Sequence, residues 1–255
     1  MDGSVSVFVC DQNTSVAATA DLLTRCRSGT GNGILQPSDS DIVQLFVSMR
    51  RGGRYIYAFD ATNPDAPKFL WKKGCPSLLN NAGCDTGYTE LGQAWSDPKP
   101  ALITYKTSPT ATAATKLVLI FGAGYDPAYE DQDPIPTSGT TQSMGRGIFV
   151  VDAADGSVLW RAGVTGSTTN ASVSGMTYAI ASDVAALDTN RDGLVDRVYL
   201  GDTGGNIWRV DLADPLVANW TVNKLASLGY AQSATNTDRR KFLYPPSVVP
   251  SKDSS

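Results

Sequence analysis

The sequence predicts an all-β fold, a partial β-propeller of about three blades, from three observations. A hairpin motif recurs along the chain, runs rich in β-branched and aromatic residues precede each copy, and helical patterns are few. Each copy reads as a glycine turn, a strand with aspartate at its end, a second turn and a strand ending in tryptophan. The copies are Gly52–Trp71, Gly145–Trp160 and Gly204–Trp220.

The remaining elements follow in chain order. A strand is expected in Met1–Val9 and a short helix in Ser15–Cys26. Further strands are expected at Ile42–Val47, Pro100–Thr104, Lys116–Phe121, Ser182–Leu187 and Val198–Leu200. With the hairpins they give about four strands per unit, which is the content of a propeller blade. The alternative is an ordinary β-sandwich with three independent tryptophan-bearing hairpins.

The number of blades predicts an incomplete domain. Closed propellers have about four to eight blades, so residues 1–255 are expected to form a domain truncated at both ends. The stretch Lys241–Pro250 reads as the beginning of another blade. No signal peptide is expected in this chain. No apolar stretch approaches about 20 residues, so no transmembrane segment is predicted.

Charge and composition exclude several function classes. The formal net charge is −4, and no cluster of Lys and Arg interleaves with aromatic residues, so nucleic acid is not an expected partner. The chain contains no histidine, which excludes histidine-dependent catalytic triads and His-ligated metal sites. We therefore expect a protein that is not an enzyme.

Four cysteines indicate an oxidising location. Their spacing, without a Cys-x-x-Cys motif, favours the local disulfides Cys10–Cys26 and Cys75–Cys84 over a zinc site. Four unpaired thiols in a reducing compartment are the alternative.

The stretch Asp188–Asp196 has the pattern of a calcium loop. Side-chain oxygens stand at loop positions 1, 3, 5 and 9, and Gly193 stands at position 6, where a calcium loop turns sharply. The expected Ca²⁺ ligands are Asp188, Asn190, Asp192, the carbonyl of Leu194, and Asp196. Position 12 is Tyr199, so the glutamate of an EF-hand is missing, and the flanking residues read as strands. The alternative is a solvated Asp/Asn turn.

These residues together resemble the C-terminal β-propeller of PilY-type proteins, the tip-associated adhesins and biogenesis factors of bacterial type IV pili. The most specific part is Asp188–Leu212, and the resemblance extends over most of residues 40–250. Further segments similar to the family are Arg51–Asp60, Leu91–Ser96, Ile120–Asp126 and Ser143–Asp152. The large N-terminal half and the signal peptide of such proteins are expected to lie outside this chain.

The resemblance implies a modified seven-bladed, quinoprotein-like propeller and a Ca²⁺ site on the loop. It also implies a role in pilus extension, retraction, twitching motility and attachment, with minor pilins and host or abiotic surfaces as partners. The implied location is the pilus tip or cell surface, outer-membrane-associated or periplasmic. Two alternatives remain: an outer-membrane assembly scaffold of the same shape, and a fragment of a quinoprotein-like dehydrogenase. Gly201–Asn206 could cradle a phosphate or form a hairpin turn.

Overall fold

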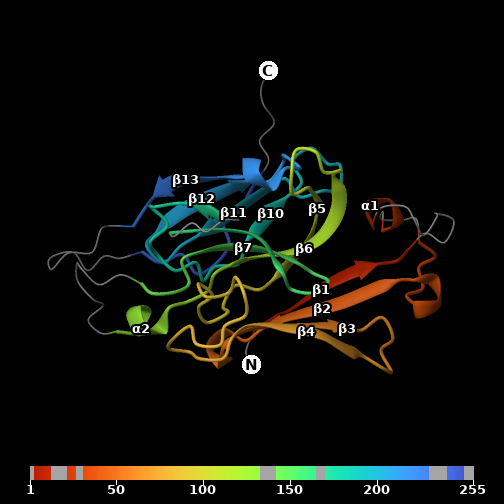
Figure 1. Ribbon diagram of the computed structural model, residues 1–255, viewed down its shortest axis with the longest axis horizontal. Coiled ribbons are helices and arrows are strands. Elements are labelled where there is room, and N and C mark those ends of the chain that lie inside the picture. Colours follow the sequence, from red (N-terminus) through yellow and green to blue (C-terminus); the bar gives the residue numbers. More distant parts are fainter. Residues whose placement is uncertain are drawn as a thin grey trace, which may run out of the picture.

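The strands of this protein form three sheets that lie side by side as blades (Figure 1). The computed structural model describes residues 3–12, 22–26, 31–132, 142–164, 170–229 and 240–249. The first blade contains β1 (Val5–Cys10), β2 (Ile42–Ser48), β3 (Arg54–Asp60) and β4 (Lys68–Cys75). The second contains β5 (Lys99–Tyr105), β6 (Ala114–Gly122), β7 (Gly147–Asp152), β8 (Val158–Gly163) and β9 (Asn170–Ser172). The third contains β10 (Ala185–Leu187), β11 (Arg197–Gly201), β12 (Asn206–Asp211) and β13 (Thr221–Ser227).

Helices are short. They are α1 (Leu22–Arg25) and α2 (Pro127–Glu130), with 3-10 turns at Pro37–Asp39, Arg50–Gly52 and Val217–Asn219. Of the helix expected at Ser15–Cys26, the part before Leu22 lies outside the described residues. None of the described helices is long and apolar enough to cross a bilayer.

The predicted architecture is confirmed. The fold is all-β, and the described strands form three blades that do not close into a ring. Two elements were not expected: α2, and β9, which pairs in parallel with β8. The expectation that Lys241–Pro250 begins a blade is not met, because its described residues contain no strand. This segment instead lies against the third blade, where the Phe242 N–H donates to the Asp202 carbonyl at 3.0 Å.

The middle blade is buried on both faces, which explains its uninterrupted apolar strands. On β6, Leu117, Leu119 and Phe121 face the first blade, whereas Val118 and Ile120 face the third. The first blade contributes Phe46, Ile56, Ala58 and Trp71, and the third contributes Val198, Leu200, Trp208 and Val210. Full burial of each large apolar side chain stabilises the fold by about 1.5–3 kcal/mol, so these two clusters hold the blades together.

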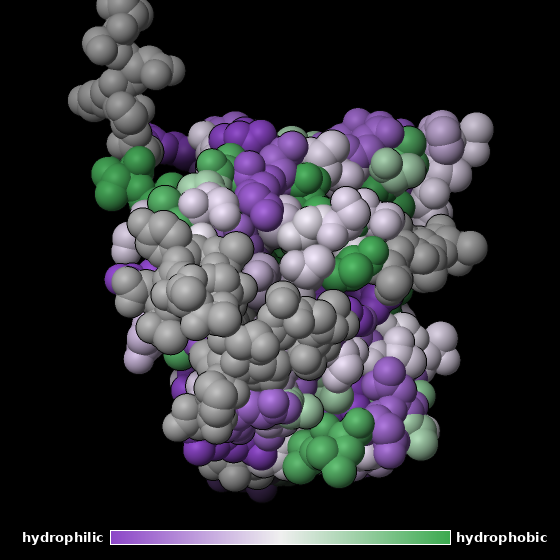
Figure 2. Space-filling view, turned by 90° about the vertical axis from the view of Figure 1, so that its left-hand side faces the viewer, coloured by the Kyte–Doolittle hydropathy of each residue, from purple (hydrophilic) through white to green (hydrophobic). Residues whose placement is uncertain are grey.

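Among the described residues, the first and third blades each have one face that no other blade covers. The alternate valines of β1, Val5, Val7 and Val9, are 53%, 49% and 51% exposed, and Leu225 on β13 is 49% exposed. On the face shown in Figure 2, apolar groups are separated by hydrophilic surface in its described part. The alternation within β1 is that of a strand with only one covered face.

The tryptophans do not end their strands, which corrects the predicted motif. Trp71 and Trp160 lie inside β4 and β8, each beside a register shift, opposite Ala58 and Val150. Trp71 joins two blades, because its Nε1 donates to the Ala153 carbonyl at 2.9 Å. Gly156 lies beneath its ring at φ +70°, where an added Cβ would come within 2.9 Å of Trp71.

The third repeat is not equivalent to the other two. Trp220 precedes β13 and packs edge-on against Trp160 with ring centroids 5.5 Å apart, while its Nε1 donates to the Asp214 carbonyl at 2.7 Å. The register shift of this blade lies between Ile207 and Trp208, and Trp208 pairs with Lys224, whose Nζ lies 4.9 Å from the ring centroid. The chain thus keeps an aromatic anchor in the blade but places it on a different strand.

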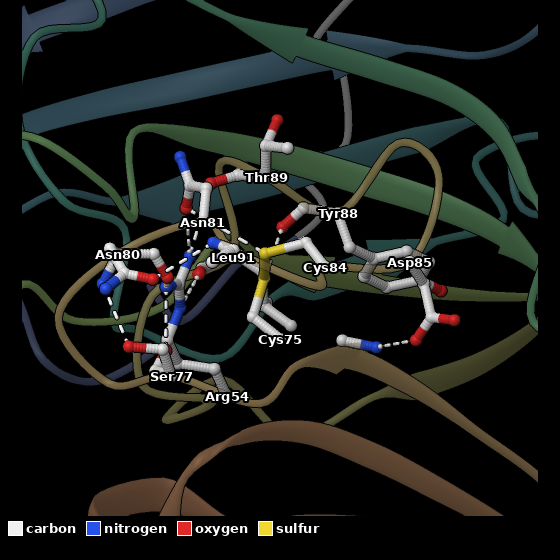
Figure 3. Close-up of a disulfide and its surroundings, with 12 residues drawn as sticks. Arg54, Cys75, Ser77, Asn80, Asn81, Cys84, Asp85, Tyr88, Thr89 and Leu91 are labelled. Atoms are coloured by element: carbon white, nitrogen blue, oxygen red, sulfur yellow. Dashed lines mark hydrogen bonds between the residues drawn. A yellow bond between two sulfur atoms is a disulfide. The ribbon is translucent and has the colours of Figure 1, made fainter.

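A buried guanidinium organises the loop that follows β4 (Figure 3). Arg54 is fully buried, and all five of its N–H groups are used. Its Nε donates to the Leu91 carbonyl at 2.6 Å, and its two Nη atoms donate to the carbonyls of Ser77, Asn80 and Thr89 and to Asn81 Oδ1. Burial lowers the pKa of Arg54.

The structure joins Cys10 to Cys26 and Cys75 to Cys84, the pairs expected from the sequence. Cys75 and Cys84 close the loop around Arg54 (Figure 3), and Cys10–Cys26 ties α1 to the end of β1. Among the described residues no cysteine is left as a thiol. The pairing is the arrangement that an oxidising compartment would stabilise.

Replacing Arg54 should destabilise the fold. Arg54→Lys should lower the free energy of unfolding by about 2–4 kcal/mol, because an ammonium group has three N–H donors for the five acceptors that the buried guanidinium satisfies. The matched control is Arg209→Lys, whose side chain is partly exposed and paired with Asp211, and which should change stability by less than about 1 kcal/mol. Urea unfolding measures both. Equal midpoints for the two variants would contradict the role assigned to Arg54.

The disulfides can be mapped directly. Non-reducing peptide mapping of protein made in an oxidising compartment should recover Cys10 linked to Cys26 and Cys75 linked to Cys84. Recovering four unmodified thiols would remove the support for an exported protein.

Candidate metal centre

The loop Asp188–Asp196 connects β10 and β11 in the third blade. Leu187 pairs with Arg197 in the antiparallel register, and the Asp196 N–H donates to the Leu187 carbonyl at 3.0 Å, which closes the neck of the loop. The expected ligand residues therefore stand on an exposed loop between two strands, as the sequence predicted.

The backbone of the loop turns sharply at two positions. Arg191 has φ +65° and Gly193 has φ +93°, both in the left-handed region. Glycine adopts this region at no steric cost, which explains the glycine at position 6. For Arg191 the same conformation is unfavourable and must be held by its surroundings.

Asp188 holds the loop in this shape. Its Oδ1 accepts the N–H groups of Arg191 at 2.6 Å and Asp192 at 3.2 Å, and its Oδ2 accepts that of Gly193 at 2.8 Å. These bonds keep the first expected ligand at the centre of the loop and compensate the strain at Arg191.

The other expected ligands are also hydrogen-bonded within the loop. Asn190 donates from Nδ2 to Asp192 Oδ2 at 2.9 Å, and Asp192 Oδ1 accepts the Leu194 N–H at 2.8 Å. Asp196 Oδ2 accepts the Thr189 hydroxyl at 2.7 Å. The sequence did not single out Thr189; its place between two expected ligands is the only signal that could have done so.

The donor set fits calcium in kind but is not gathered around one point. Carboxylate, amide and carbonyl oxygens are the ligands that Ca²⁺ takes, and each oxygen that accepts one N–H retains a second lone pair. Within the described residues, however, no three Asp, Glu, Cys or His side chains are arranged as a metal-binding group. Binding would therefore require Asp192 and Asp196 to turn away from the hydrogen bonds that they make with Leu194 and Thr189.

The loop is attached to two neighbouring elements. The Val195 N–H donates to the carbonyl of Leu102 in β5 at 2.8 Å, so the loop is bonded to the middle blade. On its other side, Leu23 of α1 lies against Gly193. Neither contact could be expected from the local sequence, because both partners are distant along the chain.

The Gly201–Asn206 segment is a hairpin turn built around a buried carboxylate. Asp202 accepts the N–H groups of Gly204 and Asn206, each at 2.9 Å, and the Trp208 Nε1–H at 2.8 Å. Since the side chain of Asp202 already occupies these donors, the turn is not shaped to cradle a phosphate.

A buried carboxylate also fixes the segment that follows the third blade. Glu130 of α2 pairs with Lys241, Nζ to Oε2, at 2.6 Å, and accepts a hydrogen bond from Gln142. The Gln142 amide also donates to Thr203 Oγ1 at 3.2 Å. These contacts connect the middle blade to the third on the side of the β11–β12 turn.

Comparison with known proteins agrees with this architecture. The family model described as the PilY1 beta-propeller domain matches residues 34–236. The chain is 28% identical over 168 residues to the type IV pilus biogenesis factor PilY1 of Pseudomonas aeruginosa, covering 66% of this chain and 11% of that protein. It is 27% identical over 186 residues to the PilY1 homolog of Xylella fastidiosa, covering 70% of this chain and 10% of that protein.

A solved structure shows the same fold. The chain matches the crystal structure of the Pseudomonas aeruginosa PilY1 C-terminal domain with a TM-score of 0.55 and 21% identity, over 97% of this chain and 41% of that one. The chain thus spans about a tenth of the length of the curated relatives it matches. Since the family model covers most of the residues and the blades have the matching fold, the chain belongs to the PilY1 β-propeller domain family.

Proposed function

We propose that this domain is a non-enzymatic, calcium-binding module of a type IV pilus biogenesis protein, and that calcium on its loop regulates pilus extension, retraction and surface attachment. The observation that carries the proposal is the oxygen-rich loop Asp188–Asp196, with both ends fixed in blade strands, in a chain of the PilY1 β-propeller family. The matched relatives are named type IV pilus biogenesis factors, which supports the non-enzymatic role.

The loop residues would hold the ion as a single set. Asp188, Asn190, Asp192 and Asp196 would supply side-chain oxygens, and Leu194 its carbonyl. Calcium would supply the positive charge that relieves the repulsion among three carboxylates. The loop residues would give up hydrogen bonds to Thr189 and Leu194 in return, so the bound and unbound loops would differ in shape next to β11.

The expected location and partners follow from the same considerations. Two disulfides would persist in an exported protein, at the pilus tip or cell surface, outer-membrane-associated or in the periplasm. Pilus components, the minor pilins among them, and host or abiotic surfaces are the proposed partners.

Calcium titration tests the site. The protein should bind one Ca²⁺ with a Kd between about 10⁻⁷ and 10⁻³ M, and Asp192→Ala and Asp196→Ala should each weaken binding at least tenfold, because each removes a charged ligand. Asp214→Ala is the matched control, since Asp214 is an exposed turn aspartate outside the loop that accepts the Leu216 N–H at 2.8 Å. No heat on titration, together with no thermal shift between calcium and chelator, would refute the site.

A fixed charge in the loop tests the regulatory role. Asp192→Lys in the full-length protein should hold pilus dynamics in one state without unfolding the domain, because its ammonium would stand in for the positive charge of the ion. Surface piliation and twitching motility are the measurements, with circular dichroism to verify folding and Asp214→Lys as the control. If the Asp192→Lys strain still changes its piliation with calcium as the parent strain does, the regulatory role is wrong.

A further inference from the structure

The calcium loop is covered on one side by a short helical turn from a distant part of the chain. A Cβ built on Gly193 would come within 2.8 Å of Leu23 Cδ1, so the leucine methyl group lies directly against the bare α-carbon. Gly193 is the residue whose N–H bonds to Asp188 Oδ2, at 2.8 Å, while Oδ1 accepts the N–H groups of Arg191 and Asp192. Leu23 therefore contacts the loop at one of the three residues that position the first proposed ligand.

The turn that carries Leu23 cannot hold its place by its own stability. α1 has four residues, and isolated helices shorter than about 12–15 residues are marginal in water. Its position must come from tertiary contacts and covalent links.

Those contacts lie in the first and middle blades. α1 lies against β6 (Figure 1). Its Leu22 side chain packs on the core cluster between the first and middle blades. Arg25 Nη1 donates to Gln12 Oε1 at 3.1 Å, just beyond the end of β1. Cys26 is bonded to Cys10, the last residue of β1, so the turn is covalently anchored to the first blade.

The opposite side of the loop is held by the middle blade. The Val195 N–H is bonded to the Leu102 carbonyl, and the Val195 side chain packs on the core between the middle and third blades. The loop tip is thus confined between a backbone hydrogen bond at Val195 and an apolar contact at Gly193. A loop confined on two sides loses less conformational freedom when it closes on an ion.

We infer that Leu23 is a positioning residue for the calcium loop and that the Cys10–Cys26 disulfide holds it there; the inference rests on the proposed calcium function. Leu23 keeps Gly193 turned so that its N–H points at Asp188. The coupling is reciprocal: calcium in the loop stabilises the seated position of α1 as much as the seated position favours calcium. Breaking this disulfide therefore weakens calcium binding in a blade that contains neither cysteine.

Two leucine variants and a control test the contact. Leu23→Ala should raise the Kd for Ca²⁺ about tenfold, as expected when a residue that orients a ligand is removed. Leu23→Met, which retains an apolar contact of similar volume, should bind within about twofold of the parent protein. Leu79→Ala is the matched control, because Leu79 is 79% exposed on the separate loop between Cys75 and Cys84.

A second measurement separates this inference from calcium binding itself. In chelator, hydrogen exchange at the Asp192 and Gly193 amides should be several-fold faster in Leu23→Ala than in the parent protein or in Leu79→Ala. If the parent protein gives no calcium heat, the proposed function fails and amide exchange alone decides whether Leu23 positions the loop. Unchanged amide exchange in Leu23→Ala overturns the inference.

The disulfide is tested in the same two assays. Cys10→Ser/Cys26→Ser should reproduce the weaker binding and faster exchange of Leu23→Ala, whereas Cys75→Ser/Cys84→Ser should leave the exchange of these two amides unchanged. Exchange at the parent rate in the first double variant overturns the role of the disulfide. An equal effect of both double variants overturns it as well, because it would reflect general loss of stability.

Discussion

The structure depends on the middle blade being buried on both faces. Its strands β6 and β7 send alternate side chains to the first and third blades, so two separate apolar clusters share one sheet. This sharing fixes the three blades relative to one another, because neither cluster can form unless the sheet lies between the other two. The stacking also brings together segments that are distant along the chain, such as α1 and the Asp188–Asp196 loop.

Buried polar groups in this fold organise turns and connections between blades. Arg54 donates three hydrogen bonds to the loop that the Cys75–Cys84 disulfide closes, and two more to the carbonyls of Thr89 and Leu91 beyond that loop. Asp202 accepts hydrogen bonds from the turn that follows it and from the indole of Trp208. In each case one buried side chain bonds to several groups of a turn, which avoids the cost of leaving its own polar atoms without partners. These hydrogen bonds fix the shape of each turn.

The Asp188–Asp196 loop differs from these turns because its carboxylates are exposed or only partly buried. Asp188, Asp192 and Asp196 bond mainly to N–H groups and the hydroxyl of their own loop, outside the core. The loop is nevertheless not independent of the fold, since Val195 and Gly193 contact elements of other blades.

Local sequence determined most of the strands, the number of blades, the cysteine pairs and the position of the Asp188–Asp196 loop between two strands. These features depend on side-chain alternation, glycine and aspartate turns, and spacing over a few residues, so a short window of sequence contains the cause. Tertiary structure decided the rest: which face of β1 stays exposed, why Trp220 packs on Trp160 instead of within a strand, and which carbonyls Arg54 binds. It also decided that the loop carboxylates bond to their own backbone and that Leu23 rests on Gly193. Those outcomes depend on residues that are far apart in the chain and meet only when the blades stack, and no local pattern specifies such a meeting.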